Sequence, residues 1–99
     1  MKIDRRFQDL VGVELPIVLA PMAGPAGSAL AIAVAEAGGV GSLPCAMLGP
    51  DQIRAELGII RQRTQSPINV NFFCHKSARA DPGRQAAWRE RLAHYYVEL

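Results

Sequence analysis

The sequence predicts an α/β fold built from three consecutive βα units with parallel strands. Short apolar runs of strand length alternate with longer segments whose apolar residues recur at helical spacing. Strands that alternate with helices of this length pair in parallel through right-handed crossovers. The chain has 49% apolar and 20% charged residues, which is typical of a globular protein with a packed core.

The first unit begins with an unbroken apolar run over residues 16–20, which suits a strand buried on both faces and ends at a proline. Residues 22–28 carry two glycines and a further proline, so a loop is expected there, with Ser28 as the N-cap of the next helix. Apolar residues at positions i, i+3, i+4 and i+7 predict a helix over 28–37, which a pair of glycines ends.

The second unit is predicted as a short strand over residues 40–43, a loop over 45–49 and a helix over 50–64. A proline stops the strand, and another proline occupies the first position of the helix, where its missing N–H has no cost. An apolar stripe that includes Ile53 and Leu57 lies opposite several arginines, which are expected to form a solvated surface.

The third unit is predicted as a strand over residues 67–73 and a helix over 82–97. Apolar and asparagine residues alternate along the strand, so its polar positions share one face. In the helix, large apolar residues recur at i, i+4, i+7 and i+11. Trp88 and Tyr95 lie on this stripe and are expected to pack in the core.

Three parallel strands would leave an unpaired edge on each side of the sheet, and such edges invite association. A complete (β/α)8 barrel has roughly 250 residues. Residues 1–99 are therefore expected to be a fragment that ends after its third βα unit, and its open edges are a reason to expect a homo-oligomer.

Composition and charge exclude several classes of protein. The net charge of +2 comes from mixed charges without a basic stripe, so nucleic-acid binding is not expected. The N-terminus is charged where a secretion signal would be apolar, and the apolar run over 29–35 is too short to span a membrane. A cytoplasmic location is expected. Cys45 and Cys74 are widely spaced, which predicts reduced, buried thiols and no metal site.

Ligands of parallel α/β folds bind beyond the carboxyl ends of the strands, which points to residues 20–27, 43–49 and 71–79. The first of these loops is glycine-rich and precedes a helix. It fails the dinucleotide-binding pattern GxGxxG, because Met22 stands where the first glycine would be. The P-loop pattern for nucleotide phosphates is absent as well.

Three segments together resemble the nitronate monooxygenase family. They are LPIVLAPMAG (15–24), AVAEAGGVGSLP (33–44) and PINVNFF (67–73), in the order and spacing of that family. The resemblance implies the first three βα units of a (β/α)8 barrel, also called a TIM barrel. It also implies an FMN-dependent oxidoreductase that oxidises alkyl nitronates with molecular oxygen.

The resemblance implies that the backbone of Ala20, Pro21, Met22 and Ala23 lines the isoalloxazine ring and that Asn71 contacts the flavin or a substrate carbonyl. Backbone N–H and C=O groups at a strand end can match the donors and acceptors of the ring, and a methionine offers it a polarizable surface. The asparagine amide has two donors and one acceptor. The competing interpretations are a core methionine after a strand end and an asparagine bonded to neighbouring backbone.

No catalytic residue is assigned within the chain. The resemblance implies that the catalytic histidine comes from a later strand, so His75 does not inherit that role and is expected to be a loop residue. Cys74 is interpreted as structural. Asn69 lies on the same face as Asn71 but one layer deeper, and it is not included in the candidate site.

Two other functions stay open. One is an FMN barrel of the enoyl reductase kind, or an FMN reductase that takes electrons from NAD(P)H. The other is a non-catalytic fragment or association module whose sheet edges are completed by another chain. The 99 residues alone are expected to be inactive and to bind FMN weakly or not at all, because most of a flavin site would be missing.

Overall fold

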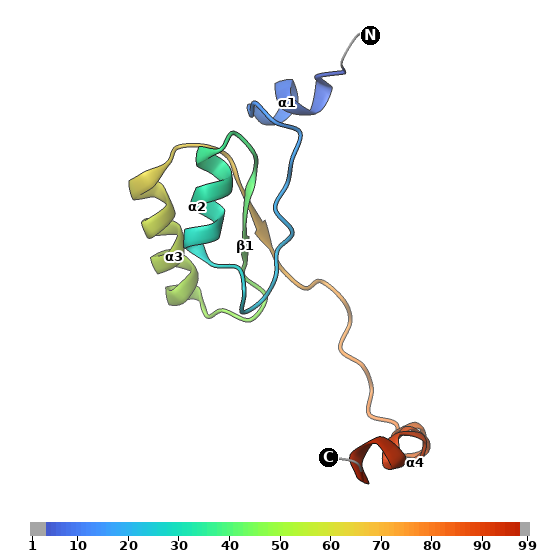
Figure 1. The fold of residues 1–99 in the computed structure, drawn as a ribbon. Helices are drawn as coiled ribbons and strands as arrows, with labels where there is room; N and C mark the ends of the chain where they lie inside the picture. Colours follow the sequence, from blue (N-terminus) through green and yellow to red (C-terminus); the bar gives the residue numbers. More distant parts are fainter. Residues whose placement is uncertain (1–3, 98–99) are drawn as a thin grey trace.

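The computed structural model describes residues 4–97 and shows a small α/β unit followed by a separate helix (Figure 1). Two short strands lie beside two helices, and a further helix lies near each end of the described chain. In chain order, the elements are α1 (Arg6–Val11), α2 (Ser28–Glu36), β1 (Gly41–Pro44), α3 (Pro50–Arg63), β2 (Ile68–Asn71) and α4 (Pro82–Val97).

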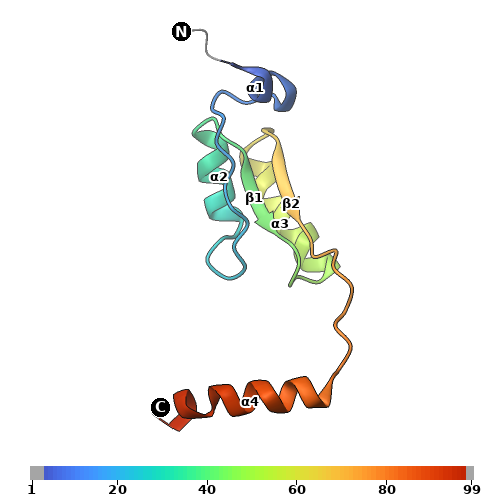
Figure 2. The ribbon, with the colours of Figure 1, turned by 90° about the vertical axis from the view of Figure 1, so that its right-hand side faces the viewer.

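Strands β1 and β2 are parallel, with Gly41 opposite Ile68 and Pro44 opposite Asn71. Helices α2 and α3 pack beside each other and cover one face of this pair, as Figure 2 shows. The second βα unit matches its prediction within a residue at each end. Strand β2 is shorter than predicted, because Phe72 and Phe73 lie outside it and are exposed.

The predicted strand over residues 16–20 is reduced to a single parallel bridge between Val18 and Val40. Two backbone hydrogen bonds hold it, from the Leu19 N–H to the Val40 carbonyl and from the Val40 N–H to the Ile17 carbonyl, both 2.9 Å. Prolines at both ends of the segment lack an N–H and limit further pairing. The described residues therefore form two complete strands and not the three that were predicted.

The core lies between the sheet and the two helices. Its buried members come from α2, β1, α3 and the residue after β1: Ala31, Ile32, Leu43, Cys45 and Ile60. Glycine at position 41 allows this packing, because a Cβ there would overlap the carbonyl oxygen of Ala31. Strand β1 consequently approaches α2 more closely than a strand with a side chain at that position could.

Helix α4 has the predicted bounds but not the predicted packing. None of its residues is buried, and an extended segment separates it from the rest of the chain (Figure 1). Trp88 is 56% exposed and Tyr95 is 60% exposed, so the prediction that they pack in the core is wrong for this structure. The apolar stripe has the expected helical spacing, but no element of residues 4–97 covers it.

The two cysteines differ. Cys45 is 1% exposed, as predicted, whereas Cys74 lies on the exposed segment after β2, so its predicted burial is wrong.

Within residues 4–97, no group of three or more histidine, cysteine or acidic side chains could hold a metal ion. None of the described helices has the length and apolarity needed to cross a membrane.

Candidate functional site

The carboxyl ends of the strands gather the candidate residues at one edge of the sheet. Asn71 ends β2 and stands opposite Pro44, the last residue of β1. On the other side of β1, the bridge at Val18 places the following residues, 20–23, toward the same edge. The two predicted parts of the site therefore flank the end of β1, as expected for a parallel α/β fold.

The two faces of the sheet have different characters. Leu43 points into the core toward the helices, so its neighbour Ser42 points to the opposite face. Asn69 stands opposite Ser42 in the register and donates a hydrogen bond from Nδ2 to the Ser42 Oγ, 3.0 Å away. Asn71 shares this face by the alternation of the strand. The face turned away from the helices thus carries the polar side chains.

Asn71 is held through its backbone and not through its side chain. Its carbonyl oxygen accepts a hydrogen bond of 2.9 Å from the N–H of Cys45. The side chain is half-buried, and within residues 4–97 its amide makes no hydrogen bond. The Asn69 amide, which the sequence analysis leaves out of the site, forms a hydrogen bond inside the protein. The Asn71 amide therefore stays available to a ligand at the edge of the sheet.

Residues 20–23 present unpaired backbone groups. Ala20, Met22 and Ala23 are exposed and Pro21 is half-buried. The Met22 carbonyl accepts a hydrogen bond of 3.0 Å from Ala26, and none of the other backbone groups of residues 20–23 is paired within the described chain. The segment turns through Gly24, whose φ of +88° suits glycine. Its N–H and C=O groups are therefore open to a ligand.

A cavity of about 330 Å³ lies at the same edge, between the glycine-rich loop, the end of β1 and the first turns of α3. Its walls are mostly apolar, and Ala23 is the only residue of the candidate site in its lining among the described residues. The lining residues are Ala23, Gly24, Ala26, Gly27, Leu43, Pro44, Met47, Leu48, Gln52, Ala55 and Glu56. The structure does not bring Met22 and Asn71 together in this cavity.

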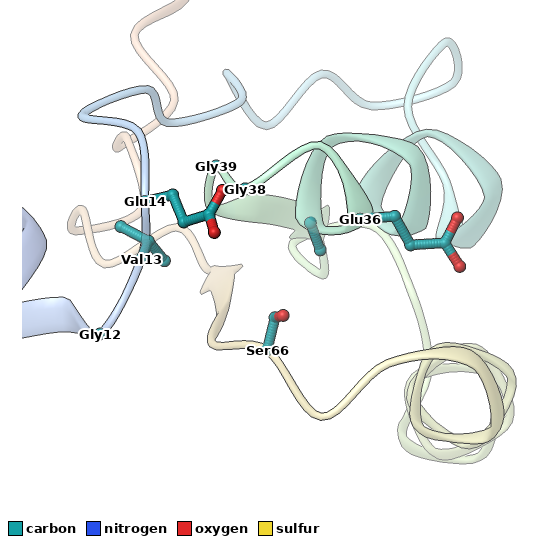
Figure 3. Close-up of a pocket in the computed structure, with 8 residues that line it drawn as sticks. Gly12, Val13, Glu14, Glu36, Gly38, Gly39 and Ser66 are labelled. Atoms are coloured by element: carbon teal, nitrogen blue, oxygen red, sulfur yellow. The ribbon is translucent and has the colours of Figure 1, made fainter.

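A second cavity, of about 270 Å³, lies at the opposite, amino edge of the sheet (Figure 3). Its lining includes Gly39, which precedes β1, and Ser66, which precedes β2. The Glu14 carboxylate lies against Gly38, whereas Glu36 points away from it and pairs with Arg63 of α3 at 3.2 Å. In barrels the amino edge contributes to stability and the carboxyl edge to catalysis. This cavity is therefore separate from the candidate site.

His75 is exposed in the segment after β2, in agreement with its interpretation as a loop residue. Its ring lies 5.8 Å from that of Phe73, with the two planes tilted by 49°. This contact is an aromatic one and gives His75 no partner for proton transfer.

The chain matches the family model described as nitronate monooxygenase over residues 4–99. It is similar to the nitronate monooxygenase of Pseudomonas aeruginosa, with 42% identity over 94 residues. This alignment covers 95% of the chain and 27% of the relative.

Two solved structures are similar to this chain. FabK from Thermotoga maritima matches 72% of the chain and 23% of that protein, with 37% identity and a TM-score of 0.67. The nitroalkane oxidase of Streptomyces ansochromogenes matches 89% of the chain and 24% of that protein, with 36% identity and a TM-score of 0.66. These neighbours are TIM barrels, and the chain spans about a quarter of the length of the proteins it matches.

Proposed function

The chain belongs to the nitronate monooxygenase family, and from this premise we propose that the protein oxidises alkyl nitronates with molecular oxygen in an FMN-dependent reaction. Residues 1–99 contribute the first three βα units of its barrel. In this proposal, the segment over 16–20 is the first barrel strand, and α4 completes the third unit once its apolar stripe is covered.

The observation that carries the proposal is the set of open polar groups at the carboxyl edge. Residues 20–23 offer backbone N–H and C=O groups, and Asn71 offers a side-chain amide on the other side of β1, that have no partner within residues 4–97. A flavin ring has hydrogen-bond acceptors and a donor along its pyrimidine edge, so these groups fit it in kind. FMN, when bound, would supply the electron transfer between the nitronate and oxygen.

The residues of this chain would bind and orient. Ala20, Pro21, Met22 and Ala23 would line one side of the ring, with the exposed Met22 side chain as a polarizable contact. Asn71 would donate from its amide to a carbonyl of the flavin or to the substrate. No proton transfer is assigned to residues of this chain, so the catalytic base would come from elsewhere in the barrel.

The test is an FMN titration of the protein expressed from its complete reading frame, compared with Asn71→Ala. Loss of one hydrogen bond to the ligand should weaken FMN or nitronate binding by about fivefold to tenfold. Gln62→Ala is the matched control, since it removes an amide from the exposed face of α3. Equal affinities for the parent and Asn71→Ala would remove Asn71 from the site.

The same preparation distinguishes the enzymatic alternatives. Oxygen consumption that depends on an alkyl nitronate supports the proposal. Oxidation of NAD(P)H without any reaction of the nitronate would instead identify an FMN reductase or an enoyl reductase-like barrel.

A further inference from the structure

The N-terminus of helix α2 has no cap from its own side chains. Its N-cap residue is Gly27, which has no side chain, and Ser28, expected from the sequence to be the cap, is already the first helical residue. The first hydrogen bond within the helix runs from the Ala31 N–H to the Gly27 carbonyl, at 3.1 Å. The amides of the first turn therefore need partners from outside the helix.

Glu56 of α3 supplies such a partner. Its Oε2 accepts a hydrogen bond of 3.2 Å from the backbone N–H of Ser28, across 28 positions of sequence. Both residues are half-buried. A carboxylate at this position also places a negative charge at the positive end of the α2 dipole. Glu56 thus joins α3 to the point where the glycine-rich loop enters α2.

The loop before α2 has few other hydrogen bonds in the described chain, although its Ala26 side chain is buried. Within it, one backbone hydrogen bond joins Met22 to Ala26 in the described chain. The cavity of about 330 Å³ lies between the loop and α3 and is lined by both Gly27 and Glu56. Side chains therefore do not fill the space between the end of the loop and α3. The hydrogen bond from Ser28 to Glu56 therefore joins the end of the loop directly to α3.

We infer that Glu56 is a positioning residue that holds residues 20–23 in place for the flavin and closes the N-terminus of α2 to other anions. Helix N-termini after glycine-rich loops are common phosphate sites. Here a carboxylate of the protein already occupies that place. The inference rests on the proposed function for its flavin part only.

The first test measures hydrogen exchange of the peptide over residues 20–31 in the flavin-free, complete protein. Glu56→Ala should speed exchange in this peptide by at least about fivefold, because the Ser28 amide loses its acceptor. Glu36→Ala is the matched control, since it breaks the pair with Arg63 that joins the same two helices at their other end. Unchanged exchange in Glu56→Ala, or an equal change in Glu36→Ala, would overturn the inference.

The second test uses FMN affinity with chemical rescue. Glu56→Ala should weaken FMN binding by about fivefold, as expected for losing a charge-assisted contact at a helix N-terminus. Formate should restore much of this loss, because a small carboxylate can enter the cavity lined by Gly27 and Glu56, next to Ser28. Glu56→Gln keeps an acceptor oxygen and should lie between the two. Failure of formate to act on Glu56→Ala, or an equal effect on Glu36→Ala, would contradict the positioning role.

The two tests separate this inference from the function on which it rests. A parent protein that takes up no FMN would overturn the proposed function and the flavin part of the inference. The exchange measurement would still decide whether Glu56 anchors the loop, because it needs neither the flavin nor a substrate.

Discussion

Removing the hydrogen bond between Ser42 and Asn69 should destabilise the protein measurably. Ser42 is completely buried, and the Asn69 amide is its hydrogen-bond partner at 3.0 Å on the neighbouring strand. Asn69→Ala leaves the buried hydroxyl without that donor, which costs about 1 to 3 kcal/mol of the free energy of unfolding. Ser42→Ala should cost less, because the half-buried Asn69 amide retains access to water.

The assay is a double-mutant cycle by urea unfolding of the flavin-free protein, with both single variants and the pair. The coupling free energy between the two positions should be about 1 kcal/mol. The first substitution already breaks the hydrogen bond, so the second one does not lose its free energy again. The m-value should stay constant, so that the midpoints report stability alone. Additive effects, with a coupling below about 0.3 kcal/mol, would refute the view that this bond joins β1 to β2.

The glycines and cysteines give three further predictions. Gly41→Ala should lower the free energy of unfolding by about 1 to 3 kcal/mol or more, because the new Cβ meets the backbone of α2; urea unfolding would contradict this if the variant matched the parent. Gly58→Ala, in the interior of α3 with open space around it, should raise stability by about 0.5 to 1 kcal/mol in the same assay. A thiol reagent should label Cys74 in the native protein and Cys45 only after unfolding, so equal labelling rates would contradict their placement.

Local chemistry explains which elements could be predicted. The helix predicted over 50–64 is found as α3, because proline at its first position and its apolar stripe act within the segment. The short strand β1 before it is predicted for the same reason, since the proline at its end lies within the segment itself. Such features need no knowledge of distant partners.

Strand pairing and side-chain burial could not be predicted from local sequence in the same way. The apolar run over 16–20 has the composition of a buried strand, but a strand also needs a continuous series of backbone hydrogen bonds to a neighbour, and within the described chain this segment forms only the bridge at Val18. The apolar stripe of α4 is regular, yet what covers it depends on residues outside the segment. Trp88 and Tyr95 are exposed for this reason.

The candidate site shows the same limit on a finer scale. The alternation along β2 places Asn69 and Asn71 on one face, but it does not say which amide is already bonded. The register with β1 decides this, because it puts Ser42 opposite Asn69. The sequence pattern predicts Ser28 as the N-cap of α2, but Ser28 is the first helical residue and its N–H is bound by Glu56. This partner could not be predicted, because Glu56 is 28 positions away in the sequence.

The most direct test of the proposed function is the visible absorption spectrum of the protein from its complete reading frame, followed by oxygen uptake with an alkyl nitronate. Bound flavin bands together with nitronate-dependent oxygen consumption are the predicted result. A colourless protein that takes up no added FMN, or a flavoprotein that leaves the nitronate unchanged, would contradict it.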